Sequence, residues 1–531
     1  MLSTKPLWTI SFCLITVTIR AQPLNIIPYP QDVRIEAGAF RVNSSTKIYY
    51  NAAFRNEVTY FQQILASEQR LKVTAVIENK AIVHNGICLH VVSDDSSSLG
   101  REGYHLQVTP RAVTVTAASP AGIFYAIQTI RQLMKDGSLP AVTISDKPAF
   151  SWRGFMLDEG RYFKGERVVK DILDEMAFLK MNTFHWHLTD DGGWRIEIKK
   201  YPKLTEIGSK RRMSELGTWL SNKFDSVPHS GFYTQEQVRA IIRYASARHI
   251  QIIPEIEMPG HASAAIASYP WLGAKNNQIE VPITFGIKPD VFNVASAKTI
   301  GFLHDVLDEI MTLFPSKIIH IGGDEVMYDQ WKASGEVLAY MNDHGIRSPA
   351  DLQINFTNNI ATYLEQHNHR MLGWNEILGG HHTNNDSTDA IARGQLTKTA
   401  IIDFWTGDPK IVTDAVTRGY DVVNSYWAYT YLDYDYHTTS LEKAYNFNAI
   451  PDSLPVSYAN KILGVSAQMW GEWIPTVARM NYLIYPRIAA IAEVGWTSQE
   501  RKDFARFSIV LKSYAKNHLS KKGIVLLPEQ L

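Results

Sequence analysis

The feature that most constrains the fold of this chain is a series of eight short apolar segments that alternate with helical stretches. The segments have the length of buried strands and cover residues 152–157, 183–188, 250–255, 317–321, 371–374, 399–405, 421–425 and 462–470. Helical periodicity fills most of the intervals, as in residues 166–180, 234–248, 298–314 and 351–367, and the last helix falls within 476–494. Strands that alternate with helices predict a parallel sheet, and eight such units predict an α/β fold with a closed (β/α)8 TIM barrel.

The residues ahead of the barrel predict a separate, small α+β domain. Residues 104–108 and 112–116 alternate apolar and polar side chains, as half-buried antiparallel strands do. Residues 121–134 follow with the apolar spacing of one amphipathic helix. We therefore expect the α+β domain over residues 22–148, the catalytic barrel over 149–500 and a C-terminal helical tail over 501–531.

The first 21 residues have the pattern of a secretory signal peptide. Lys5 precedes an apolar run over residues 7–19, and the small residue Ala21 suits cleavage. The run is short for a bilayer span, which makes a membrane anchor the less favoured alternative. Removal of the peptide also removes Cys13 and leaves Cys88 as a single cysteine, which cannot form an internal disulfide. We expect an exported protein, periplasmic or extracellular at the cell surface.

The charge balance argues against a nucleic-acid partner. Lys and Arg together number 53, as do Asp and Glu, so the formal net charge is zero, whereas phosphate binding needs a basic excess or stripe. The chain also has 13 Trp and 25 Tyr. Aromatic side chains in such numbers fit either a large core or a pocket that stacks against sugars.

Polar and aromatic residues, most of the polar ones acidic, follow nearly every predicted barrel strand, where the active site of such a barrel lies. They are Asp158, Arg161, Asp190, Asp191, Glu257, His261, Asp324, Glu325, Trp374, Glu376, Trp405, Tyr431, Asp433, Trp470 and Glu472. Carboxylates surrounded by Trp and Tyr suit a neutral, hydroxyl-rich ligand with flat C–H faces. These properties describe a sugar.

The most informative motif is His320-Ile-Gly-Gly-Asp-Glu325. Adjacent strand residues face opposite ways, so Asp324 and Glu325 reach one substrate only if the chain turns at Gly322 and Gly323. Two neighbouring carboxyl groups also move each other's pKa values apart, which leaves one as a proton donor and the other ionised. A surface acidic turn or a helix cap is the structural alternative.

With its companions, this motif resembles the pattern of glycoside hydrolase family 20, the β-N-acetylhexosaminidases, in their exo-acting bacterial form. The companion motifs occur in the expected order, and the resemblance covers almost all of the mature chain, including the small N-terminal domain. They are Asp158-Glu-Gly-Arg161, His185-Trp-His-Leu-Thr-Asp190-Asp191, Pro254-Glu-Ile-Glu-Met-Pro-Gly-His261, Trp374-Asn-Glu, Tyr431-Leu-Asp433 and Trp470-Gly-Glu472. The resemblance implies hydrolysis of terminal non-reducing β-linked GlcNAc or GalNAc by a retaining, substrate-assisted mechanism.

The resemblance also implies the catalytic roles. Glu325 would be the general acid and then the base, while Asp324 would hold the 2-acetamido group whose carbonyl oxygen attacks the anomeric carbon. Tyr431 would donate a hydrogen bond to that oxygen. Asp190 and His261 would orient Asp324 or Glu325. No cofactor and no metal ion are implied.

For substrate binding, the resemblance assigns Arg161 and Glu472 to ring hydroxyls and Asp433 to O4 or O6. The walls around the sugar would be Trp374, Trp405 and Trp470. The expected partner is an oligosaccharide or glycoconjugate that contains N-acetylhexosamine, with no nucleic acid and no membrane span, and the protein would be a monomer or homodimer. The choice between GlcNAc and GalNAc stays open.

Three other interpretations remain. A metal-dependent barrel hydrolase could use His185 and His187, which lie on one face of a strand. A sugar-binding module without catalysis would keep the Trp walls but lose an acid, whereas Asp324, Glu325 and Tyr431 are all present. Within the family, a lacto-N-biosidase-like enzyme would release a disaccharide and would need a pocket open beyond O3.

Overall fold

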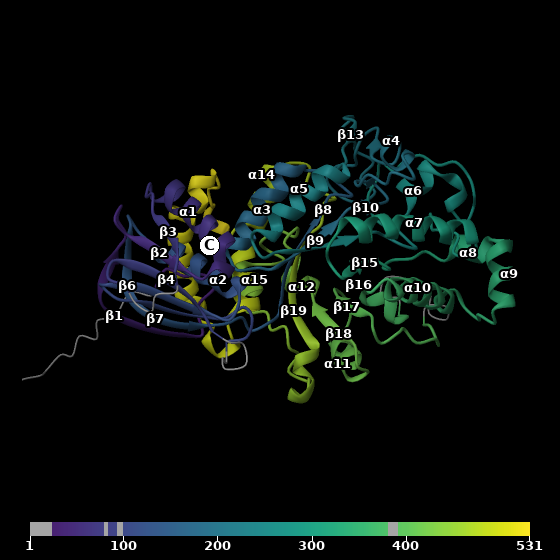
Figure 1. The fold of residues 1–531 in the computed structure, drawn as a ribbon. Helices are drawn as coiled ribbons and strands as arrows, with labels where there is room; N and C mark the ends of the chain where they lie inside the picture. The colour runs from purple at the N-terminus through teal and green to yellow at the C-terminus, as the bar shows by residue number, and fades with distance from the viewer. Residues whose placement is uncertain (1–23, 79–82, 93–98, 381–390, 531) are drawn as a thin grey trace, which may run out of the picture.

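The computed structural model describes residues 24–78, 83–92, 99–380 and 391–530, and the predicted signal peptide lies outside them. Figure 1 shows an N-terminal sheet with its helices beside a larger barrel. Among the described residues, none of the helices combines the length and the apolar character that crossing a bilayer requires.

Eight parallel strands close into the barrel, which confirms the predicted fold class. They are β8 (Trp152–Asp158), β9 (Thr183–His187), β14 (Gln251–Glu255), β15 (Ile318–His320), β16 (Arg370–Trp374), β17 (Ile401–Phe404), β18 (Asp421–Asn424) and β19 (Ile462–Met469). β19 pairs with β8, and β9 pairs with β14, so the ring has no open edge. Every residue of β8 and β9 is buried, as expected for parallel strands that helices cover.

The helices around the barrel follow the predicted periodicity. They are α3 (Glu166–Phe178), α5 (Gln235–Ser246), α7 (Ala297–Leu313), α10 (Pro349–Gln366), α11 (Lys410–Thr417), α14 (Val477–Ile484) and α15 (Arg487–Trp496). The single helix expected within residues 476–494 is thus two helices, α14 and α15. Pro486 separates them because its ring occupies the space of a helical carbonyl and it has no N–H to donate.

The loops after the strands carry short elements of their own. They are β10 (Thr189–Asp190), β11 (Gly193–Trp194), α4 (Lys203–Glu206), β12 (Lys210–Arg211), β13 (His229–Ser230), α6 (Ser263–Ser268), α8 (Asp329–Ala333), α9 (Gly335–Asp343), α12 (Trp427–Thr430) and α13 (Leu441–Tyr445). These loops form the end of the barrel that holds the site.

The N-terminal domain is a seven-stranded sheet in the order β1-β7-β5-β6-β4-β2-β3. Its strands are β1 (Asp32–Arg41), β2 (Lys47–Tyr50), β3 (Thr74–Ile77), β4 (Gly86–Val91), β5 (Tyr104–Val108), β6 (Ala112–Ala117) and β7 (Ser138–Asp146). β5 and β6 are antiparallel as predicted, but β6, β4, β2 and β3 pair in parallel. A parallel pair needs a crossover, which explains the helix that the sequence analysis missed between β2 and β3.

That helix is α1 (Arg55–Glu68), so the described part of this domain has two α-helices instead of the one expected. The predicted helix is α2 (Pro120–Leu133), in which every residue from Gly122 to Ile130 is buried. A helix that is buried on all sides lies between two layers. Tyr125 of α2 packs edge-on against Trp496 of the barrel, with ring centroids 5.0 Å apart.

The C-terminal tail forms α16 (Phe504–Asn517), which packs back onto α3. The carboxylate of Glu175 is buried there and contacts His518 at 2.9 Å as well as Tyr514 and Lys522. Burial alone would raise the pKa of Glu175, but the positive charges of His518 and Lys522 outweigh it and hold that pKa well below its usual range. The tail is thus joined to the barrel through a buried charge cluster.

Candidate active site

The turn after β15 brings the two central carboxyl groups to the end of the barrel. Gly322 and Gly323 have φ values of +66° and +88°, in the left-handed region that glycine tolerates, and Glu325 has a φ of +52°. A Cβ on Gly322 would overlap the carboxylate of Glu257. The predicted role of the two glycines is therefore a steric requirement of this turn.

A cavity of about 530 Å³ opens at this end of the barrel. It is lined by every residue that the sequence analysis assigned to catalysis or substrate binding, namely Arg161, Asp324, Glu325, Trp374, Trp405, Tyr431, Asp433, Trp470 and Glu472. A larger cavity, lined by residues such as Arg101, Lys147 and Gln251, lies where the N-terminal domain meets the opposite end of the barrel. We place the chemistry in the smaller cavity because only that one gathers the carboxyl groups at the strand ends.

Aromatic rings form the walls of the smaller cavity. Trp374 is fully buried, and its indole Nε1 donates to Glu255 Oε1 at 2.8 Å. Its ring lies 5.6 Å from that of Trp470, while Trp405 and Tyr431 lie nearly parallel with centroids 6.2 Å apart. Such walls offer wide apolar surfaces with little side-chain entropy to lose, which suits the flat faces of a sugar ring.

His261 lies between the two central carboxyl groups. Its Nε2 is 3.7 Å from Asp324 Oδ2 and 3.5 Å from Glu325 Oε2. Burial disfavours a charged imidazole, but the carboxylates of Asp190, Asp191 and Asp324 outweigh it, so the pKa of His261 lies well above its usual range. A positive charge therefore faces both carboxyl groups.

The hydrogen-bond partner that fixes His261 is Asp191. His261 Nδ1 lies 2.9 Å from Asp191 Oδ2, and the other oxygen of Asp191 accepts hydrogen bonds from the backbone N–H and hydroxyl of Ser263. The family resemblance implies that Asp190 orients Asp324 or Glu325, but Asp190 Oδ2 lies 3.7 Å from this nitrogen of His261, farther than Asp191. Because Asp190 and Asp191 are adjacent, only the shape of the loop decides which one meets the imidazole.

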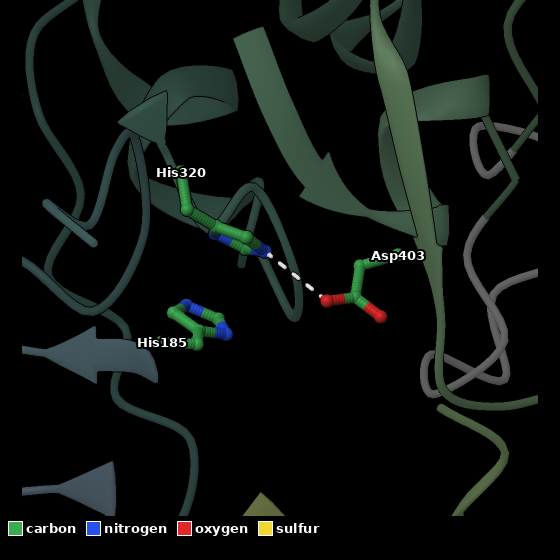
Figure 2. Close-up of side chains that lie close together, drawn as sticks. All are labelled: His185, His320 and Asp403. Atoms are coloured by element: carbon green, nitrogen blue, oxygen red, sulfur yellow. Dashed lines mark ion pairs between the residues drawn. The ribbon is translucent and has the colours of Figure 1, made fainter. Parts of the chain in front are cut away.

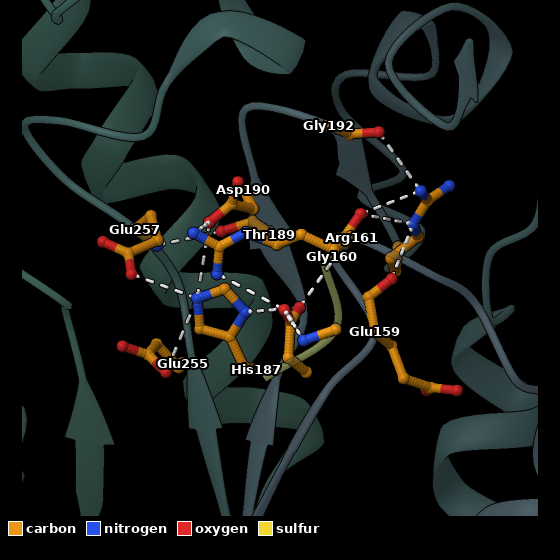
Figure 3. Close-up of polar contacts among 12 residues, drawn as sticks. Glu159, Gly160, Arg161, His187, Thr189, Asp190, Gly192, Glu255 and Glu257 are labelled. Atoms are coloured by element: carbon orange, nitrogen blue, oxygen red, sulfur yellow. Dashed lines mark hydrogen bonds and ion pairs between the residues drawn. The ribbon is translucent and has the colours of Figure 1, made fainter. Parts of the chain in front are cut away.

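Asp190 instead holds Arg161, as the polar contacts in Figure 3 show. Asp190 Oδ2 lies 3.0 Å from Arg161 Nη2, and Asp158 Oδ2 lies 3.3 Å from Nη1. The guanidinium also lies 5.0 Å from the centre of the Trp470 ring. Arg161 is thereby fixed at the cavity wall, where a rigid fork of N–H groups can bind neighbouring hydroxyls.

Burial is the main cause of the raised pKa values of three carboxyl groups in the cavity, those of Asp324, Asp433 and Glu472. The pKa of Asp324 is raised to about 7 by burial, with a further contribution from the charge of Glu325 and opposition from His261. The pKa of Asp433 is raised to about 8 by burial and by Glu472. Burial also raises the pKa of Glu472, although Arg161 opposes the shift. Carboxyl groups with raised pKa values are protonated for part of the time at neutral pH, so they can both donate hydrogen bonds to hydroxyls and accept them.

The histidines that suggested a metal site each contact a carboxyl group. His187 lies 3.1 Å from both Asp158 and Glu257, and His185 Nε2 is 2.8 Å from Glu255 Oε2. His320 sits beside His185 in the barrel interior, with Asp403 4.0 Å from its Nε2 (Figure 2). Imidazole–carboxylate contacts such as these need no metal ion, and through Glu255 they connect to Trp374 in the cavity wall.

Further residues line the cavity that the sequence analysis did not assign. They are Trp219, Leu220, Phe285, Gly286, Ile287, Lys288, Tyr434, Trp473 and Ile474. Trp473 directly follows Trp470-Gly-Glu472, so its position was a usable signal. Trp219 and Phe285 lie in long irregular loops, where no periodicity marks a side chain as part of a site.

A closed parallel barrel whose strand ends hold paired carboxyl groups within aromatic walls defines a carbohydrate-active hydrolase. Comparison with family models gives the same class. Residues 150–499 match the model of the glycosyl hydrolase family 20 catalytic domain, and residues 23–147 match the model of the family's domain 2. The chain belongs to glycosyl hydrolase family 20.

Curated relatives and solved structures agree with this assignment. The chain is 36% identical to a β-hexosaminidase of Porphyromonas gingivalis over 96% of its own length and 65% of that protein, so it spans slightly less than two thirds of this relative. It is 32% identical to a β-hexosaminidase of Vibrio furnissii, over 90% of this chain and 77% of that protein.

Among solved structures, an exo-β-N-acetylglucosaminidase of Vibrio harveyi in complex with N-acetylglucosamine has a TM-score of 0.82 at 29% identity, covering 96% of this chain and 79% of that one. A β-N-acetylhexosaminidase of Bacteroides fragilis has a TM-score of 0.79 at 30% identity, covering 95% and 97%.

Proposed function

We propose that this protein hydrolyses terminal, non-reducing β-linked N-acetylhexosamine residues of oligosaccharides or glycoconjugates, with retention and with participation of the substrate's own acetamido group. The observation that carries the proposal is that Asp324, Glu325 and Tyr431 line one cavity with aromatic walls. The names of the relatives, β-hexosaminidases among them, support the substrate class.

In the first step, the acetamido carbonyl oxygen attacks the anomeric carbon while Glu325 gives its proton to the glycosidic oxygen, and the alcohol leaves. Asp324 stabilises the positive charge that develops on the acetamido group. The Tyr431 hydroxyl can donate to the carbonyl oxygen, because burial raises the pKa of Tyr431 well above its usual range and keeps it protonated. This attack is intramolecular, so it gains the rate advantage of a preoriented nucleophile.

In the second step, the Glu325 carboxylate takes a proton from water, and the resulting hydroxide equivalent opens the cyclised intermediate at the anomeric carbon. Glu325 suits both steps because its side chain is 22% exposed, whereas that of Asp324 is 9% exposed. Water therefore has access to the acid–base residue, while the residue that stabilises charge lies deeper. His261 can hold a proton opposite either carboxylate.

The fixed polar side chains that line the cavity favour release of a single sugar. Arg161, fixed by Asp158 and Asp190, forms part of its lining together with Asp433 and Glu472. Polar groups held in this way suit the free hydroxyls of a terminal residue. A disaccharide-releasing enzyme would need open space there, and it remains the alternative within the family.

A panel of 4-nitrophenyl β-glycosides tests the proposal. We expect turnover of the GlcNAc or GalNAc glycoside and a rate at least ~10³-fold lower on the plain glucoside, which lacks the acetamido nucleophile. Similar rates on glucoside and GlcNAc glycoside would contradict acetamido participation, and binding without turnover would indicate a sugar-binding protein. Lasting inactivation by EDTA that zinc reverses would favour the metal-dependent alternative.

We also propose that the protein is exported to the periplasm or the cell surface. The signal-peptide pattern of residues 1–21 supports this, and the described part of the chain holds Cys88 as a buried free thiol. Cell fractionation of the full chain, compared with a variant that lacks residues 2–21, tests the proposal. An unchanged cytoplasmic distribution in both would refute it.

A further inference from the structure

The mouth of the catalytic cavity carries an apolar lip that none of the family motifs includes in full. We define the lip as Trp219, Leu220, Phe285 and Trp473, all of which line the cavity. Trp219 is 53% exposed and Leu220 is 86% exposed, which is unusual for large apolar side chains grouped at one site. The Trp473 ring packs edge-on against Trp219 at 6.0 Å and against Phe285 at 5.2 Å.

Buried polar contacts hold the lip in place. One carboxylate oxygen of Glu215 accepts from the backbone N–H of Ser221 at 3.1 Å, and the other accepts from that of Phe285 at 3.1 Å. Glu215 is 1% exposed and thereby ties the loop that bears Trp219 to the loop that bears Phe285. The lip is thus a braced structure that joins two loops far apart in the sequence.

Local backbone geometry supports the same conclusion. Leu220 has a φ of +60°, which is costly for a side chain with a Cβ and persists only where the surroundings impose it. Gly286 has a φ of +83°, and a Cβ there would lie 3.2 Å from the Trp219 ring. The chain therefore keeps an exposed Trp and Leu at this mouth at a conformational cost.

The position of the lip indicates which part of a substrate it meets. The sugar that is cleaved off lies among the buried walls, such as Trp374 and Tyr431, which are 0% and 5% exposed. In an exo-acting enzyme, whatever projects from the cavity toward solvent is the leaving group. Side chains that line the cavity and are also largely exposed, like Trp219, therefore lie beside the leaving group.

We propose that Trp219, Leu220 and Trp473 form a leaving-group subsite that binds the first pyranose ring beyond the scissile bond, with the Trp rings against its flat C–H face and Trp473 packed on the buried Phe285. Contact with this ring raises kcat/KM on substrates whose leaving group is a saccharide, a gain that substrates with a small leaving group do not have. This inference rests on the proposed function, since it assumes that the cavity cleaves a terminal N-acetylhexosamine.

The test compares two substrates that differ only in the leaving group: N,N′-diacetylchitobiose, which has a pyranose there, and N-acetyl-β-glucosaminyl fluoride, which has a single atom. We expect Trp219→Ala to lower kcat/KM on chitobiose relative to the fluoride by about tenfold, the scale of a lost aromatic contact at a partly exposed site. Trp219→Phe should recover part of the ratio because it keeps a ring. Activity on the fluoride also shows that each variant is folded.

A matched pair of substitutions controls for loss of exposed apolar surface. Leu220→Ala removes a lip side chain, whereas Leu338→Ala removes one that is 48% exposed on α9. We expect only Leu220→Ala to lower the chitobiose-to-fluoride ratio. An unchanged ratio in Trp219→Ala, or an equal loss on both substrates, would overturn the subsite. If the unmodified protein cleaved neither substrate, the proposed function itself would fail.

Discussion

Replacing Asp324 by Asn removes one negative charge and nearly preserves the shape of the side chain. The intermediate formed by acetamido attack carries a positive charge, which Asp324 would face at about 4 Å. At an effective dielectric constant of about 20, opposite charges at this distance attract by about 4 kcal/mol. His261, 3.7 Å from Asp324, offsets part of this attraction, and the Asn oxygen keeps part of the hydrogen bonding. We therefore expect kcat to fall by ~10²- to 10³-fold.

The assay is kcat on aryl β-GlcNAc substrates that range from 2,4-dinitrophenyl to phenyl. Asp324→Asn should slow all of them by similar factors, because Asp324 acts on the nucleophile. Glu325→Gln should spare the dinitrophenyl substrate and lose most on the phenyl one, since only a basic leaving group needs a proton. Azide should partly restore Glu325→Ala on the activated substrate and leave Asp324→Ala unchanged.

The opposite pattern, with azide rescue of the Asp324 variant and none of the Glu325 variant, would refute these roles.

Thermal melting separates an effect of Asp324→Asn on catalysis from an effect on folding. Burial raises the pKa of Asp324 to about 7, so the folded state binds this proton more tightly than the unfolded chain does. The stability that this group contributes is complete below the unfolded pKa and is lost as the pH rises through 7. Asp324→Asn should therefore melt no lower than the unmodified protein at pH 7.

Three further predictions test the fold and the site. Gly322→Ala should lower the free energy of unfolding, measured by urea titration, by several kcal/mol or prevent folding. The control Gly345→Ala has the same φ of +66° but open space around it, so it should lower this free energy by only about 1 kcal/mol. Equal losses in the two variants would disprove the steric role of Gly322. Asp191→Asn should lower kcat by ~10²-fold or more in a variant that still melts cooperatively, and unchanged kinetics would show that His261 needs no partner. Glu175→Gln should lower Tm most at neutral pH. The difference in Tm between this variant and the unmodified protein should shrink as the pH falls below about 4, because the pKa of Glu175 is depressed in the folded state. A Tm difference that does not depend on pH would contradict the charge cluster.

Much of the fold and the center of the site could be predicted from the sequence, because both rest on local patterns. The period of the apolar residues distinguishes the buried strands from the helices around them, and eight repeats of that alternation leave few architectures other than a barrel. Gly322 and Gly323 adopt positive φ values that glycine tolerates best, so the turn that presents Asp324 and Glu325 could be predicted from these residues alone. Since strand ends share one face of a barrel, the residues after each strand were expected together, and nine of them line one cavity.

Other features depend on contacts between segments far apart in the sequence. Helix α1 and the parallel half of the N-terminal sheet went unpredicted because the direction of strand pairing is decided by the crossover and leaves little trace within each strand. Asp190 and Asp191 are chemically identical neighbours, and only the loop geometry assigns one to Arg161 and the other to His261. The lip likewise exists only because Glu215 joins two loops whose own sequences have no period. The sequence by itself determined the barrel and its catalytic turn, because apolar periodicity fixes the barrel and the backbone freedom of glycine fixes the turn. The tertiary structure decided which side chains meet, because those contacts depend on how distant loops pack.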